Sequence, residues 1–141
     1  MSIYADSSFF VSVYTNDVHS QAARKRAAQR FAVWLTPLHR AEWANALALA
    51  VFRRFISADQ AQQARFVFAR DLRSGLWVAK AFPESVFDRS ADIATTYSVR
   101  LGTRTLDALH VACALELGAK EFWTFDDRQA KLAKAVGLKV V

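Results

Sequence analysis

Short apolar runs and longer amphipathic stretches alternate along the whole sequence. The short runs stop at polar or turn-forming residues, which is typical of buried strands. Between them, apolar residues recur every three or four positions, as expected of helices that cover a core on one side. The predicted strands span residues 3–5, 32–35, 76–79, 122–125 and 138–141. The predicted helices span residues 9–13, 19–31, 38–55, 58–72, 84–101, 106–117 and 128–136.

This alternation predicts an α/β protein with a mostly parallel central sheet and helices on both faces, because parallel strands need a crossover connection that is usually a helix. The 141 residues suit one globular domain, spanning residues 1–141, with a core of its own. In such folds ligands bind beyond the carboxyl ends of the strands. The residues that follow strands are therefore the first candidates for chemistry.

Composition indicates a folded protein in a reducing compartment. Hydrophobic residues make up 53% and charged residues 23% of the sequence, with only 4 Gly and 2 Pro, which argues against disorder. Cys113 is the single cysteine, so an intrachain disulfide and a cysteine-based metal site are excluded. The N-terminal residues do not resemble a signal peptide. The longest apolar run, residues 44–52, is far shorter than the roughly 20 residues of a membrane span. We expect a cytoplasmic protein with no membrane segment.

The formal net charge of +6 and the sequence pI near 9.9 favour a polyanionic partner such as a nucleic acid. An acidic protein or a membrane surface would satisfy the same charge. Arginines on predicted helices are the candidates for phosphate contacts, although each is equally well explained as part of a solvated helix face. These arginines are Arg24, Arg26, Arg30, Arg65, Arg70 and Arg73. An exposed aromatic ring among Phe66, Phe68 and Trp77 would stack a base or receive a partner segment.

Four carboxylates, Asp6, Glu42, Asp107 and Asp126, lie where a predicted element begins or ends. Asp6 and Asp126 follow strands, and Asp107 falls in the first turn of a helix, where the helix dipole favours negative charge. Taken singly, each acid is as well explained as a helix cap or a solvated acid. Together they predict a metal site, because neighbouring carboxylates stay ionised most easily around a cation. With no His or Cys cluster beside them, these oxygen ligands favour Mg²⁺ or Mn²⁺.

Several segments resemble the PIN-domain ribonucleases, and more narrowly the VapC-type toxins of type II toxin–antitoxin pairs. The resemblance extends over essentially the whole chain, and its most specific part lies in the C-terminal half. The matching segments are Tyr4–Ser8, Ala41–Leu47, Arg104–His110, Phe122–Asp127 and Gly137–Val141.

The resemblance implies a PIN-like three-layer α/β/α sandwich that acts as a metal-dependent endoribonuclease, in which a metal-activated water attacks the RNA phosphodiester bond. Carried over position by position, the catalytic and metal-binding set is Asp6, Glu42, Asp107 and Asp126. Ser7, Ser8 and Thr124 match neighbouring polar positions that would orient ligands or water. Asp127 would support or replace Asp126. The resemblance also implies a homodimer and a cognate antitoxin protein as partner.

Two other functional classes stay open. A non-catalytic RNA- or protein-binding module on a degenerate PIN scaffold would keep the fold without the chemistry. A response-regulator receiver or a haloacid-dehalogenase-like phosphatase would share the layered class. However, residues 6–8 lack the Asp-x-Asp of the phosphatase, and no acidic pair follows the first strand. His110, one helical turn after Asp107, is interpreted as a packed side chain and not as a general base.

Overall fold

The computed structural model describes residues 1–141 and contains a four-stranded, fully parallel sheet. Its strands are β1 (Ser2–Ala5), β2 (Ala32–Leu35), β3 (Trp77–Ala79) and β4 (Glu121–Trp123). Their spatial order is β3-β2-β1-β4. In the central strand β1, Tyr4 lies opposite Trp34 on one side and Phe122 on the other. The predicted parallel sheet is therefore confirmed.

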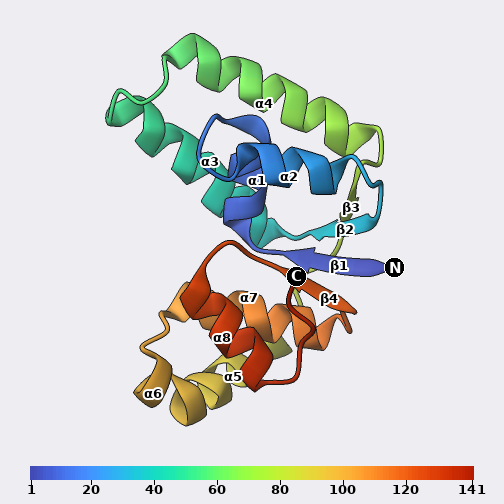
Figure 1. Ribbon diagram of the computed structural model, residues 1–141, viewed down its shortest axis with the longest axis vertical. Helices are drawn as coiled ribbons and strands as arrows, with labels where there is room; N and C mark the ends of the chain where they lie inside the picture. Colours follow the sequence, from blue (N-terminus) through green and yellow to red (C-terminus); the bar gives the residue numbers. More distant parts are fainter.

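Helices form a layer on each face of the sheet, as predicted (Figure 1). One layer consists of α1 (Ser7–Tyr14), α2 (Ser20–Ala27), α3 (Pro37–Phe52) and α4 (Ala58–Arg73). The other layer consists of α5 (Ser85–Ile93), the π-helical turn η1 (Ala94–Ser98), α6 (Val99–Leu101), α7 (Thr105–Glu116) and α8 (Asp127–Ala135). No helix in either layer has the length and apolar character needed to cross a membrane.

The helix predicted over residues 84–101 is interrupted in its second half by η1. There the hydroxyl groups of Thr95 and Thr96 donate hydrogen bonds to the carbonyl oxygens of Ala91 and Asp92. Such side-chain bonds to the backbone compete with regular helical pairing and bend helices. The apolar spacing predicted a helix correctly, but it could not indicate the local change of hydrogen-bond register.

Three other predicted elements are clearly shorter than expected. The helix predicted over 19–31 ends at Ala27, and Arg30 after it has a left-handed φ of 54°. The helix predicted over 38–55 ends at Phe52, because Arg54 has a left-handed φ of 60° that a right-handed helix cannot include. The strand predicted over 138–141 is reduced to a single bridge between Val140 and Phe122. Because β4 is itself only 3 residues long, it offers little ladder for a fifth strand to extend along.

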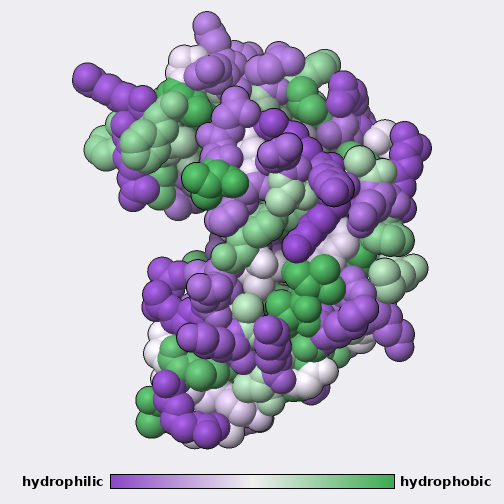
Figure 2. All heavy atoms as spheres, viewed as in Figure 1, coloured by the Kyte–Doolittle hydropathy of each residue, from purple (hydrophilic) through white to green (hydrophobic).

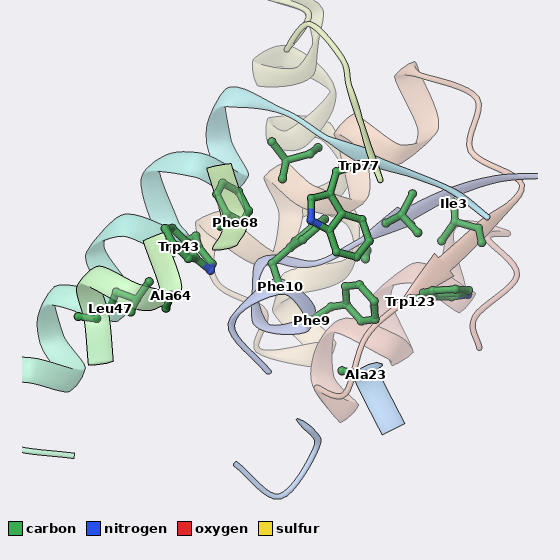
Figure 3. Close-up of a cluster of buried hydrophobic side chains, with 14 residues drawn as sticks. Ile3, Phe9, Phe10, Ala23, Trp43, Leu47, Ala64, Phe68, Trp77 and Trp123 are labelled. Carbon is green, nitrogen blue, oxygen red and sulfur yellow. The ribbon is translucent and has the colours of Figure 1, made fainter. Parts of the chain in front are cut away.

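A cluster of aromatic rings forms the core between the sheet and the layer of α1 to α4 (Figure 3). Phe10 and Phe9 meet Trp77 edge-on, with ring centroids 5.2 and 6.1 Å apart, a favoured geometry for aromatic pairs. Trp77 and Phe68 are 2% and 7% exposed, whereas Phe66 is 62% exposed. Of the three rings considered for base stacking, Phe66 alone is therefore on the surface.

A second core lies between the sheet and the layer of α5, α7 and α8. Tyr4 of β1 stacks on Phe122 of β4 there, with ring centroids 5.7 Å apart, and Leu109 of α7 packs into the same cluster. Strand β1 thus lies between two cores, with Ile3 in one and Tyr4 in the other. The residues that follow β1 are consequently held in a fixed position.

Candidate active site

The four acids singled out in the sequence line one cavity at the carboxyl edge of the sheet. Asp6 follows β1, Glu42 lies on α3, Asp107 is in the first turn of α7, and Asp126 precedes α8. The cavity has a volume of about 430 Å³, and Leu106 is the one hydrophobic residue in its wall. Figure 2 shows a hollow between the two helical layers on the side where β1 ends. Four separate segments thus bring carboxylates to one place.

A second cavity, of about 400 Å³, differs from the acidic cavity in chemistry. It lies between the end of α1 and α4, and apolar side chains such as Val13, Ile56 and Val67 make up most of its wall. No carboxylate or basic group lines it. This apolar cavity therefore offers no group for acid–base or metal chemistry.

Asp6 is the most enclosed of the four acids, with 5% of its surface exposed. It is the N-cap of α1: Oδ1 accepts hydrogen bonds from the backbone N–H of Phe9 at 3.1 Å and from Ser8 Oγ at 2.7 Å. Oδ2 accepts a bond from Thr124 Oγ1 at 2.8 Å. Burial nevertheless raises the pKa of this carboxyl, because the three donors offset the desolvation only in part.

Glu42 is half-buried and is held by two side chains from other elements. Ser7 Oγ donates to Glu42 Oε1 at 2.8 Å, and His110 Nε2 makes a short hydrogen bond to the same oxygen. Burial by itself would raise the pKa of Glu42, but the bonds from His110 and Ser7 outweigh it and lower that pKa. The carboxylate form of Glu42 is therefore favoured.

Asp107 has the N3 position of α7 and is 7% exposed. Its Oδ2 accepts a hydrogen bond from the backbone N–H of Arg104 at 2.9 Å, which closes the first turn of the helix. The guanidinium of Arg104 lies near the same oxygen, with Nε at 3.4 Å. The capping interpretation of Asp107 is thus correct for one oxygen, while the residue also lines the cavity.

Thr124 connects two of the acids. Its hydroxyl donates to Asp6 and accepts a hydrogen bond from the backbone N–H of Asp126 at 3.0 Å. Asp126 is the N-cap of α8, and its Oδ1 accepts from the backbone N–H of Gln129 at 2.8 Å. Asp127 is exposed in the first turn of α8 and does not line the cavity. Of the two neighbouring acids, Asp126 therefore faces the site.

Three of the acids keep one carboxylate oxygen without a hydrogen bond. Protein donors reach Oε1 of Glu42, Oδ2 of Asp107 and Oδ1 of Asp126, and none reaches the other oxygen of each group. Hard, ionised oxygens of this kind suit Mg²⁺ or Mn²⁺. As the side chains stand, no three His, Cys, Asp or Glu side chains are close enough to hold a metal ion. The chemistry of these oxygen donors nevertheless fits a divalent cation.

Three residues of the cavity wall have surroundings that the sequence did not predict. Arg104 brings a positive charge to the rim, and His110, although buried as interpreted, bonds directly to Glu42. The side chain of Gln129 is 3% exposed, and its buried Oε1 has no hydrogen-bond partner. A Gln three residues after an N-cap usually bonds back to the cap N–H, but here Thr124 accepts from that N–H.

The six arginines considered for RNA contacts do not surround the cavity. Arg30 lies two residues before β2, and Arg73 ends α4 shortly before β3, so both lie at the amino edge of the sheet, opposite the acids. Arg24 bonds the carbonyl oxygens of Val13 and Thr15, and Arg26 bonds that of Val141. The other two lie on α4, where Arg70 pairs with Asp71 at 2.9 Å and Arg65 is exposed.

The chain is similar to a known protein family and to several solved structures. The family model described as PIN domain matches residues 3–135. No curated protein matches the sequence. Among solved structures, Mycobacterium tuberculosis VapC20, a toxin that cleaves the sarcin–ricin loop, is similar with a TM-score of 0.70 and 16% identity, covering 96% of this chain and 95% of VapC20.

Two further solved structures have the same fold. VapBC2 from Rickettsia felis, bound to a DNA fragment from its promoter, is similar with a TM-score of 0.68 and 13% identity, covering 100% of this chain and 98% of that one. FitAcB from Neisseria gonorrhoeae is similar with a TM-score of 0.68 and 17% identity, covering 98% of this chain and 95% of that one. At these identities the likeness establishes the fold.

Proposed function

Because this chain belongs to the PIN-domain family, we propose that it is an Mg²⁺- or Mn²⁺-dependent endoribonuclease that hydrolyses RNA phosphodiester bonds. The observation that carries the proposal is the meeting of Asp6, Glu42, Asp107 and Asp126 on one polar cavity. Three of these acids have an oxygen left free for a cation. These free, ionised oxygens favour a cation site over a non-catalytic binding module.

The chain's own residues have separate tasks in this proposal. The same four acids would hold the cation, which when bound supplies Lewis-acid activation of the attacking water. Ser7, Ser8 and Thr124 fix the orientation of Glu42 and Asp6 through the hydrogen bonds described above. Arg104, exposed at the rim, is placed to bind the RNA phosphate and to offset the negative charge of the acids. No protein nucleophile takes part.

We further propose that the protein is the toxin of a type II toxin–antitoxin pair, acting in the cytoplasm as a homodimer that a cognate antitoxin neutralises. The support is the PIN family and the likeness to VapC20, which is a toxin. VapBC2 and FitAcB, which have the same fold, add to that support. Growth inhibition on expression, relieved by a co-expressed antitoxin, is the expected phenotype.

The test of the nuclease proposal is Asp107→Asn. Asn keeps an oxygen that can accept the Arg104 N–H, so the first turn of α7 and the fold are expected to persist. Mg²⁺-dependent RNA cleavage should fall to background and growth inhibition should disappear. Cleavage is measured on purified protein with and without EDTA, and folding by circular dichroism.

Asp59→Asn is the matched control, because Asp59 is also in the first turn of a helix but is exposed on α4, away from the cavity. It should cleave like the wild type. Wild-type cleavage by Asp107→Asn would contradict the proposal. The non-catalytic alternative is separated by calorimetric titration, since a module with a dead site should take up no Mn²⁺.

A further inference from the structure

His110 connects the hydrophobic core to the metal-binding carboxylate of Glu42. Its imidazole is 2% exposed and lies on α7, one turn after Asp107. Nδ1 lies 2.9 Å from the hydroxyl of Tyr4, and Nε2 bonds to Glu42 Oε1. Tyr4 is completely buried in β1, two residues before Asp6. The chain of contacts therefore begins in the buried central strand of the sheet and ends in the acidic cavity.

The chemistry of Glu42 fixes the direction of its hydrogen bond to His110. An ionised carboxylate only accepts, so Nε2 carries the hydrogen that is donated to Glu42. On the other side of the ring, Nδ1 is hydrogen-bonded to the Tyr4 hydroxyl. The ring also packs against two aromatic neighbours, with centroids 5.0 Å from His39 and 5.7 Å from Tyr4. The orientation of the His110 ring is thereby determined.

Glu42 needs this support more than the other three acids do. Asp6, Asp107 and Asp126 each accept a backbone N–H from the first turn of a helix, which orients the carboxylate without help from distant residues. Glu42 lies in the second turn of α3, where the backbone N–H groups are already paired within the helix. Its long side chain has more rotamer freedom than Asp and no local donor to restrict it.

We propose that His110, held by Tyr4, is a positioning residue that fixes Glu42 so that Oε2 faces the cation site. Both donors, His110 Nε2 and Ser7 Oγ, bond to Oε1, which leaves Oε2 without a hydrogen bond. The inference rests on the metal-dependent nuclease function proposed above. It adds a residue that contacts neither cation nor RNA but sets the affinity for the cation through Glu42. Removal of a partner of this kind typically weakens metal binding by a factor of roughly 10 to 100.

The experiment measures Mn²⁺ affinity by calorimetry on the full chain. His110→Leu should raise the Kd by about 10-fold or more, and His110→Gln, which can still donate to Glu42, should recover part of the affinity. Tyr4→Phe removes only the hydroxyl that holds Nδ1 and should raise the Kd by a smaller factor. It also keeps the test valid if His110→Leu fails to fold. In a Glu42→Gln background, His110→Leu should have no further effect.

His19→Gln is the control, since His19 is an exposed histidine at the start of α2 that does not line the acidic cavity and makes no contact with Glu42 or His110. It should leave the Kd unchanged. An unchanged Kd in folded His110→Leu and Tyr4→Phe, with Mn²⁺ still bound and RNA still cleaved, would overturn this inference and leave the nuclease proposal standing. A wild type that neither binds Mn²⁺ nor cleaves RNA would overturn both.

Discussion

Asp6 is a carboxylate enclosed almost completely by protein, so its ionised form carries a desolvation cost. Burial raises the pKa of Asp6 above the usual 3.8, although Ser8, Thr124 and the N–H of Phe9 all donate to it. A carboxyl whose pKa is higher in the folded state than in the unfolded state binds protons more tightly when folded. Ionised Asp6 therefore weakens the metal-free fold.

We predict that Asp6→Asn stabilises the metal-free protein at neutral pH. Asn still caps α1 at the Phe9 N–H but has no charge to desolvate. The wild type should lose stability as pH rises from about 3.8 through the folded-state pKa, and the variant should lack this decrease. Each pKa unit corresponds to about 1.4 kcal/mol, so thermal unfolding in EDTA at acidic and neutral pH resolves the effect.

With Mn²⁺ present the order should reverse, because the cation stabilises only the variant that binds it well, which is the wild type. A lower melting temperature for Asp6→Asn than for the wild type in EDTA at neutral pH would contradict the prediction. Glu116, which is half-buried and paired with Arg89, provides a control: Glu116→Gln should not gain stability.

Which single residues matter was only partly predictable from sequence. Asp6 and Asp126 follow from where buried strands end, and that depends on local apolar pattern. The bond from His110 to Glu42 joins residues 68 positions apart, and nothing local indicates it. Gln129 has the spacing of a capping partner, but Thr124 accepts from the N–H that it would use. Contacts between distant segments decide these roles.

At the scale of elements, His39 joins the start of α3 to the end of β1. Its Nδ1 accepts from the Thr36 backbone N–H at 3.0 Å, and its Nε2 donates to the Ala5 carbonyl at 2.7 Å. These two bonds hold the start of α3, the helix that carries Glu42, against the end of β1, which Asp6 follows. Burial lowers the pKa of His39 well below 6.5, and His110 lowers it further, so the imidazole is neutral in the fold.

We predict an acid-sensitive connection at this point. A histidine whose pKa is depressed by folding takes up its proton first in the unfolded state, so stability should fall as pH drops below about 6.5. His39→Gln, which can still bond Thr36 or Ala5 but does not titrate, should flatten this fall while being less stable at pH 7 by about 1–3 kcal/mol. Urea unfolding of metal-free protein at several pH values measures the slope.

The same slope in His39→Gln as in the wild type would assign the acid sensitivity to another group. His19→Gln is the control, since His19 is exposed at the start of α2.

The ends of helices are harder to predict from sequence than their presence. The apolar spacing predicted that α3 ends at residue 55, but the helix ends at Phe52 because Arg54 has a positive φ. A left-handed residue is expected at Gly, and an arginine gives no such signal.

At the scale of the whole molecule, the layered architecture was predictable because strand and helix periods alternate along the chain. The placement of charge was not predictable. The net charge of +6 applies to the entire surface, whereas Arg30 and Arg73 lie at the amino edge of the sheet and the acids at the carboxyl edge. Arg104 is the arginine in the cavity wall. Phosphate binding at both edges therefore requires an RNA long enough to pass along the molecule.

We predict that RNA length separates the two groups of arginines. In an Asp107→Asn background, which prevents cleavage, Arg104→Gln should weaken binding of an RNA of about 6 nucleotides and of one of about 30 nucleotides alike. The pair Arg30→Gln and Arg73→Gln should weaken only the long RNA, and should make the slope of log affinity against log salt shallower by about 0.7 for each phosphate that is no longer neutralised. Filter binding across a salt series measures both quantities. Arg89→Gln is the control, because Arg89 lies on α5, is paired with Glu116 and does not line the acidic cavity. Equal affinity of the long RNA for the wild-type and the Arg30/Arg73 proteins would restrict the RNA path to the acidic cavity and its rim.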